Sequence, residues 1–172
     1  SQIVAFSIQQ SDSVTAVSAS LRDATYETLG ITREIQVIPN FIRIEEYDHV
    51  PLNLQLKQKY APNGEKIITH ISNFRKVKRI DDVVRIFEKV RTKIPSKLLL
   101  VGDGPERHNI EKMCRDMNLA DDVLMLGKLK QTIDFLKISD LFILPSETES
   151  FGLAALEAMA AGVPVISSNT GG

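Results

Sequence analysis

From Lys66 onward the chain alternates between short apolar runs and longer amphipathic segments, and this alternation limits the possible folds more than any other feature. The apolar runs are almost wholly hydrophobic instead of alternating with polar residues. Strands of this kind need cover on both faces, as in parallel sheets. The expected strands are Ile67–Ile71, Lys97–Val101, Val123–Leu126, Leu141–Leu144 and Val163–Ile166.

The segments between these runs carry apolar residues three and four positions apart, as Val83, Val84, Phe87 and Val90 do. That period is typical of a helix with one buried face. Strand and helix units that alternate through right-handed crossovers form an α/β fold with a doubly wound, Rossmann-like parallel sheet. The expected helices cover residues 80–93, 105–117, 131–139 and 151–161.

Residues 1–50 differ from the regular alternation that begins at Lys66, and they predict a short unit that contains both strands and a helix. Its expected elements are a strand at Val14–Ser18, a helix at Ala19–Leu29 that Gly30 ends, and a strand at Gln36–Pro39. A polar helix is expected at residues 52–60. The chain stops at Gly171-Gly172, inside what should be another strand-to-helix turn, so we expect it to be part of a longer protein.

Charge and cysteine content narrow the classes of partner. The net charge is −1, from 21 basic and 22 acidic residues, so no net field favours nucleic acid or a membrane surface. No apolar run is long enough to span a bilayer. Cys114 is the single cysteine, which excludes an intrachain disulfide and favours a reducing cytosol. Its helical spacing with Ile110, Met113 and Met117 predicts a buried position and not a nucleophile.

Glu149 and Glu157 flank the expected start of a helix. They follow the loop Pro145–Glu149 between two apolar runs, at the edge of the sheet where doubly wound folds bind ligands. The backbone amides near Phe151, Gly152 and Leu153 are expected to lack internal partners and to favour an anion. A phosphate with sugar hydroxyls on both sides, as in a nucleotide sugar, fits this arrangement.

A basic loop follows the strand Ile67–Ile71. Arg75 offers a planar fork and Lys78 a point charge, and together they suit a diphosphate. The loops Gly102–Pro105 and Gly127–Leu129 follow the next two strands on the same edge, but their residues by themselves are ordinary turn chemistry.

No cofactor or metal ion is expected. No two aspartates lie two positions apart, as a metal–diphosphate site commonly needs, and His49, His70 and His108 lack metal-ligand spacing. His70 interrupts an apolar strand and is expected to be a hydrogen-bonded core histidine.

Several of these segments resemble the donor domain of retaining glycosyltransferases of family 4. The segments are Gly102–Pro105, Pro145–Leu153 and Glu157–Val165, with Val14–Ser18 and Val37–Asn40 similar to the family's interdomain region. The resemblance implies the GT-B fold, in which two Rossmann-like domains face a cleft. Residues 1–50 are then the tail of the N-terminal acceptor domain with the interdomain region, and residues 51–172 the nucleotide-sugar-binding domain, truncated at its C-terminus.

The resemblance also implies roles for particular residues. Glu149, Lys78 and Arg75 are the catalytic group: Glu149 holds hydroxyls of the donor sugar, and the two cations stabilise the leaving diphosphate. Where the family commonly has an arginine, this chain has Asn73, so Arg75 is expected to supply that charge from a shifted position. Glu157 accepts hydrogen bonds from the ribose. The remaining donor-binding residues are Asn73, Lys128, Leu129, Ser150, Phe151, Gly152 and Leu153.

A narrower resemblance rests on His70–Arg79 and Ser146–Gly152, which are similar to family members that act in bacillithiol biosynthesis. It implies transfer of N-acetylglucosamine from UDP-N-acetylglucosamine, with retention and without metal, to a small hydroxy acid such as L-malate. These 172 residues alone are then expected to be inactive. Another donor or acceptor, a UDP-sugar epimerase, a binding module and a homo-oligomer all remain open.

Overall fold

The computed structural model describes residues 2–171, which form two compact units. The smaller unit comprises residues 2–41, 148–153 and 169–171, and the larger comprises residues 42–147 and 154–168.

The larger unit is built on a five-stranded sheet in the order β5-β4-β3-β6-β7, with every neighbouring pair parallel. This confirms the predicted doubly wound sheet. The strands are β3 (Lys66–Ile71), β4 (Ser96–Val101), β5 (Val123–Gly127), β6 (Leu141–Leu144) and β7 (Val165–Ser167).

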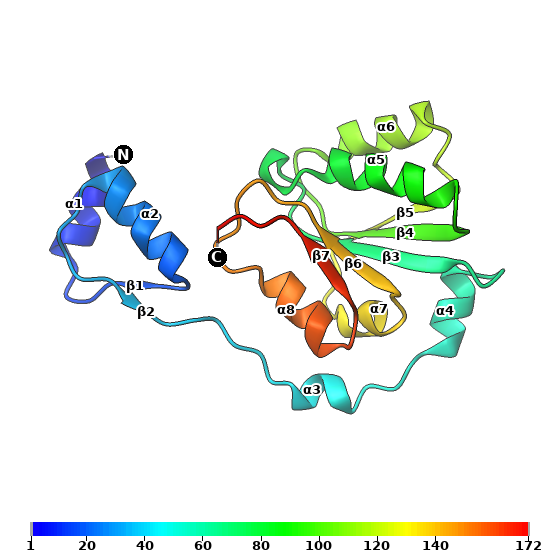
Figure 1. Ribbon diagram of the computed structural model, residues 1–172, viewed down its shortest axis with the longest axis horizontal. Helices are drawn as coiled ribbons and strands as arrows, with labels where there is room; N and C mark the ends of the chain where they lie inside the picture. The colour runs from blue at the N-terminus through cyan, green and yellow to red at the C-terminus, as the bar shows by residue number, and fades with distance from the viewer. Residues whose placement is uncertain (1, 172) are drawn as a thin grey trace. The chain divides into compact units, whose positions relative to one another are not determined.

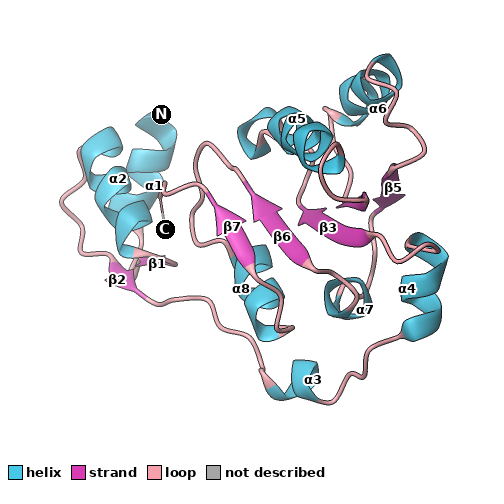
Figure 2. Ribbon diagram, turned by 45° about the vertical axis from the view of Figure 1, so that its right-hand side comes forward, coloured by secondary structure: helices cyan, strands magenta, loops and turns pink. Residues whose placement is uncertain are grey.

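Helices cover both faces of this sheet (Figure 1). Figure 2 shows α5 and α6 on one face, and α7 and α8 on the other. The apolar face of α5 buries Val83, Val84 and Phe87 against Leu98 and Leu100 of β4. Buried apolar area of this kind stabilises by roughly 25 cal/mol per Å². The larger unit's helices are α3 (Glu45–Asp48), α4 (Leu54–Tyr60), α5 (Ile80–Arg91), α6 (Arg107–Asp116), α7 (Ile133–Lys137) and α8 (Leu153–Ala160), the first residue of α8 being assigned to the smaller unit.

The smaller unit pairs β1 (Thr15–Ala16) with β2 (Gln36–Val37) in parallel, and it also contains α1 (Gln2–Gln10) and α2 (Ala19–Leu29). The predicted end of α2 is confirmed: Gly30 has φ 60° and its N–H donates to Tyr26 O. Glycine adopts this left-handed conformation without steric cost.

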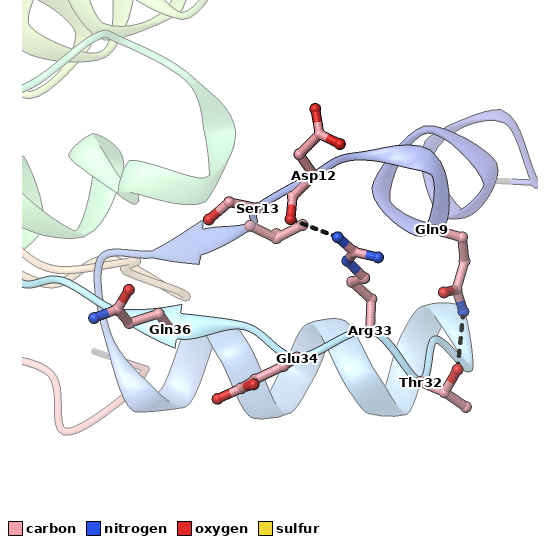
Figure 3. A pocket seen from close by; sticks show the side chains of 8 residues that line it. Gln9, Asp12, Ser13, Thr32, Arg33, Glu34 and Gln36 are labelled. Atoms are coloured by element: carbon pink, nitrogen blue, oxygen red, sulfur yellow. Dashed lines mark hydrogen bonds between the residues drawn. The ribbon is translucent and has the colours of Figure 1, made fainter.

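A polar pocket lies in the smaller unit (Figure 3). Two hydrogen bonds connect residues of its lining: Arg33 donates to Asp12 O, and Gln9 Nε2 donates to Thr32 Oγ1 at 3.4 Å. Its lining residues are Gln9, Asp12, Ser13, Val14, Thr32, Arg33, Glu34 and Gln36.

Several expected boundaries were wrong by a few residues. The last strand begins at Val165 instead of Val163, because Pro164 has no N–H for the ladder, although its carbonyl accepts from Phe142 N at 2.9 Å. The strands of the smaller unit are also shorter than expected, and α1 and α3 were missed. The four residues of α3 are too few to show a helical period.

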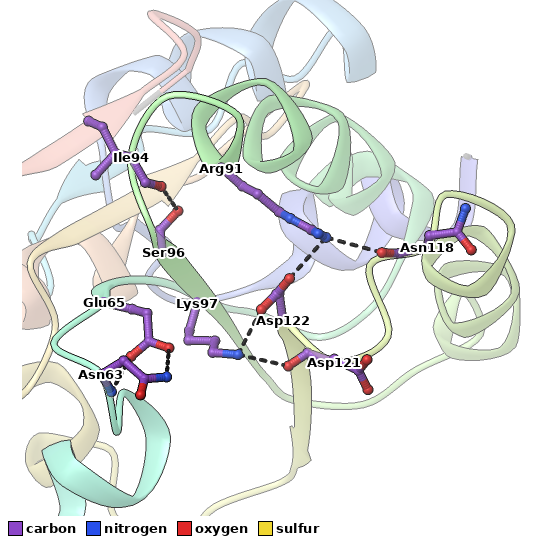
Figure 4. Close-up of polar contacts among 9 residues, drawn as sticks. All are labelled: Asn63, Glu65, Arg91, Ile94, Ser96, Lys97, Asn118, Asp121 and Asp122. Carbon is purple, nitrogen blue, oxygen red and sulfur yellow. Dashed lines mark hydrogen bonds and ion pairs between the residues drawn. The ribbon is translucent and has the colours of Figure 1, made fainter.

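Charged side chains at the amino ends of β4 and β5 pair with one another (Figure 4). The Asp122 carboxylate forms one ion pair with the Arg91 guanidinium, at 2.9 Å, and another with Lys97 Nζ, at 2.7 Å. At this end of the sheet, Asp122 therefore pairs with one cation from α5 and one from β4.

Cys114 lies on α6 in the main core, as its spacing predicted, and is 5% exposed. Burial raises the pKa of its thiol to about 11. Within residues 2–171, none of the helices is long and apolar enough to cross a membrane.

Candidate functional site

The strand order reverses its direction between β3 and β6. The chain runs from β3 outward through β4 to β5, and then returns to place β6 on the other side of β3. Ligands of doubly wound folds bind beyond the carboxyl ends of the strands at such a reversal. The loop that begins at Ser72 leaves β3 at this point, and the loop that begins at Pro145 leaves β6 there.

The loop after β3 is fixed at its beginning by the last residue of β4 and by the Gly102–Gly104 turn that follows it. Ser72 N donates to Val101 O at 3.1 Å, and Phe74 N donates to Asp103 O at 2.9 Å. A Cβ on Gly102 would lie 1.8 Å from Ser72 O, and one on Gly104 would lie 2.7 Å from Phe74 O. The two glycines are thus needed for packing between loops, in keeping with the turn chemistry expected of them.

The same loop is fixed at its far end by the loop after β6. Glu147 N donates to Val77 O at 2.8 Å, which joins the two loops at the reversal. A short 3₁₀ turn (Lys76–Lys78) includes this anchor, and Arg79 adopts φ 50° before α5 begins. Phe74 is fully buried between these attachments, so the backbone of the loop is held at both ends.

The predicted phosphate-binding residues of this loop differ in exposure. Asn73 and Arg75 are exposed, and Lys78 is half-buried. Over the part of the chain that the structure describes, the Arg75 guanidinium forms no ion pair. The loop therefore carries cationic side chains on a backbone that is anchored at both ends.

Lys128 and Leu129 follow β5 on the same edge of the sheet. Lys128 is exposed and Leu129 half-buried. Gly102 N donates to Gly127 O at 2.8 Å, so the loops after β4 and β5 are joined at their bases.

Glu157 is half-buried on α8, and desolvation raises its pKa above the ordinary value. Tyr47 of α3 belongs to the same apolar cluster as Ala155 and Ala158, which lie on α8 beside Glu157. Burial, and then the negative charge of Glu157, raise the pKa of the Tyr47 hydroxyl. The sequence analysis did not single out Tyr47; its signal was an aromatic residue among acidic neighbours.

Residues Glu149 to Leu153 belong to the smaller unit. The Ser18 hydroxyl donates to Ser150 O at 2.6 Å, and a Cβ on Gly171 would lie 2.2 Å from Glu149 O. The helix was expected to begin at residue 151 but begins at Leu153, because Gly152 has φ 85°. Phe151 and Gly152 thus precede the helix.

The pocket of the smaller unit and the arrangement of possible metal ligands are also relevant to the predicted site residues. The polar pocket of the smaller unit contains none of the residues proposed to bind a donor. Among residues 2–171, no group of three or more histidine, cysteine, aspartate or glutamate side chains could hold a metal ion.

The fold and the basic loop define a doubly wound α/β domain with cations at its strand reversal. The chain belongs to the family of group 1 glycosyl transferases, whose family model matches residues 53–172.

Individual relatives agree with this family. The chain is 48% identical, over 99% of its length and 45% of the relative's, to the N-acetyl-alpha-D-glucosaminyl L-malate synthase of Bacillus anthracis. It thus spans less than half of that relative. Anabaena HepE, solved with UDP and glucose, matches the fold with a TM-score of 0.86 and 21% identity, over 99% of this chain and 48% of HepE.

A second solved structure is a mutant of S. aureus TarM in complex with fondaparinux, alpha-GlcNAc-glycerol and UDP. It matches with a TM-score of 0.78 and 26% identity, over 98% of this chain and 32% of TarM.

Proposed function

We propose that the protein containing this chain is a retaining glycosyltransferase that transfers N-acetylglucosamine from UDP-N-acetylglucosamine to L-malate. The observation that carries this proposal is the 48% identity to an N-acetyl-alpha-D-glucosaminyl L-malate synthase over almost the whole chain. The anchored basic loop at the strand reversal supports it, since an anionic diphosphate is the part of the donor that such a loop recognises.

This chain supplies the donor-binding part in our proposal. Residues 1–50 are the tail of the acceptor domain with the interdomain region, and residues 51–172 bind the nucleotide sugar. Asn73 and Arg75 approach the diphosphate together with Lys78. Lys128 and Leu129 lie beside the base, and Glu157 accepts hydrogen bonds from the ribose hydroxyls. Glu149 holds the sugar, and the backbone from Ser150 to Leu153 lies beside the phosphate.

The reaction exchanges one glycosidic bond for another. The bond between the anomeric carbon and the UDP oxygen breaks, and a bond to the malate hydroxyl oxygen forms on the same face. The hydroxyl proton passes to a phosphate oxygen of the departing UDP. Lys78 and Arg75 stabilise the charge that develops on the diphosphate, and preorganised charges of this kind act most strongly in the transition state.

The cellular setting that we propose is the cytosol, where UDP-sugars and a reduced Cys114 occur together.

The test supplies UDP-N-acetylglucosamine to the protein containing this chain, with and without L-malate. We expect UDP and an α-linked N-acetylglucosaminyl malate in equal amounts, and no reaction of the sugar without an acceptor. An isomerised UDP-sugar formed without malate would identify an epimerase, and binding without turnover a binding module. Turnover with a different hydroxy acid or nucleotide would retain the transferase and replace the substrate.

A further inference from the structure

His70 is a polar residue at the centre of the sheet. It lies in β3 and is fully buried, at 0% exposure. Its ring nitrogen Nδ1 lies 2.8 Å from Ile143 O of β6, and Nε2 lies 2.8 Å from the Ser72 hydroxyl. The expected hydrogen-bonded core histidine is confirmed, and both of these contacts lie at the strand reversal.

The chemistry of the two partners assigns the protons. A carbonyl oxygen can only accept, so Nδ1 must carry the hydrogen that is donated to Ile143 O. In the neutral ring Nε2 then accepts, and the Ser72 hydroxyl donates to it. The ring therefore joins β6 to the first residue of the basic loop.

This link occurs where backbone pairing between the two strands stops. Among the described residues, β3 and β6 pair at two positions, Ile68 with Leu141 and Thr69 with Phe142. By contrast, the ladder between β3 and β4 continues to Ile71 and Val101. The His70 ring connects β3 to β6 one residue beyond the last of their pairs.

We propose that His70 is a positioning residue for the loop from Ser72 to Lys78, and so for the diphosphate. This inference rests on the proposed donor-binding function. Ser72 is held by its hydroxyl to His70 and by its N–H to Val101 O, so the direction in which the chain leaves β3 is fixed on two sides. That direction sets where Arg75 and Lys78 stand relative to β6.

Substitutions can separate the two contacts of the ring. Gln reaches the position of Nε2 and can accept from Ser72, whereas Asn reaches the position of Nδ1 and can donate to Ile143 O. His70→Leu removes both contacts, and Ser72→Ala removes the loop contact from the other side. Thr69→Val is the matched control, since Thr69 is a fully buried residue of the same strand whose hydroxyl contacts Ser139 Oγ at 2.6 Å, away from the loop.

Two measurements on the protein containing this chain test the proposal. The first is hydrogen exchange at the amides of Phe74 and Glu147, which report the loop's anchors without any ligand. The second is the ratio of the dissociation constants for uridine and UDP. We expect His70→Leu, His70→Asn and Ser72→Ala to speed exchange and lower this ratio by about three- to tenfold each, the effect of losing roughly one net hydrogen bond.

We expect His70→Gln and Thr69→Val to leave both readouts within about twofold of the wild type, even where they lower the melting temperature. The proposal is overturned if His70→Gln behaves like His70→Leu, or if Thr69→Val reproduces the loop effect, because either result indicates general destabilisation. A wild-type protein that does not bind UDP would refute the proposed function, while the exchange rates would still decide the role of His70.

Discussion

Glu157 combines a negative charge with partial burial, and this combination has a measurable consequence for nucleoside binding. We expect Glu157→Ala to weaken uridine binding about 10- to 100-fold, because the proposed charge-assisted hydrogen bonds to ribose contribute roughly 1.5–3 kcal/mol. Calorimetry measures the change, and Glu88→Gln on α5, which covers the opposite face of the sheet, is the control. An unchanged affinity in a folded Glu157→Ala protein would contradict the ribose assignment.

The raised pKa of Glu157 fixes the sign of the accompanying pH dependence. The carboxylate, which is the better acceptor, is protonated as the pH falls through this raised value. Uridine affinity should therefore decline from a higher pH than an ordinary glutamate would give, and Glu157→Gln should flatten the profile.

Lys78 is predicted to serve the diphosphate and not the nucleoside. Lys78→Ala should weaken UDP about 10- to 100-fold, as expected for a lost hydrogen bond between charged groups, and change uridine affinity by less than about twofold. Competition binding with both ligands measures this difference. Lys76→Ala, an exposed lysine in the same 3₁₀ turn, should change UDP affinity much less. Equal losses for UDP and uridine would remove Lys78 from the phosphate site.

Among the elements of the fold, the turn between β4 and α6 has little tolerance for a side chain. Gly102→Ala should destabilise the larger unit by about 3 kcal/mol or more, because its Cβ would meet Ser72 O at 1.8 Å and its φ is 129°. Urea denaturation measures the loss. Gly64→Ala is the control: its φ is 80°, but a Cβ there meets nothing within 4 Å, so about 1 kcal/mol is expected. Similar losses at both glycines would show that packing against Ser72 contributes little.

How far the elements could be predicted depended on which physical signal each one carries. The five strands of the main sheet and the helix α5 were predicted because apolar runs and helical periods report burial directly. The end of α2 was predicted because glycine at position 30 is a local signal for a helix end. The start of α8 was misplaced, since the positive φ of Gly152 is a backbone property that spacing does not reveal.

Residues of the candidate site could be named from the sequence, but the contacts that hold their backbone in place could not. Arg75 and Lys78 could be named from their position after a strand. The contacts that hold their loop could not, because they join Val77 to Glu147 and Phe74 to Asp103, pairs far apart in the chain. His70 shows the same limit: its burial was predicted, but its partner carbonyl lies 73 residues away.

At the scale of the whole molecule, these 172 residues cover 45% of the N-acetyl-alpha-D-glucosaminyl L-malate synthase relative, and in our proposal the acceptor lies mainly on the other domain. Holding acceptor and donor together can supply roughly 7–11 kcal/mol of a reaction barrier. We therefore expect the isolated chain to release no UDP above background, even where it binds the nucleotide. A full-length protein assayed at equal concentration is the control. Comparable turnover by the isolated chain would place the acceptor site within these residues.

Because Cys114 is buried, the rate at which its thiol is labelled reports how often the surrounding structure opens. Thiol reagents attack the thiolate, and a thiol whose pKa is about 11 supplies little of it near neutral pH. Because the sulfur also lies in the core between α6 and the sheet, modification should await an opening of that helix. The dependence of the labelling rate on urea then distinguishes local fraying of α6 from complete unfolding, without any engineered probe.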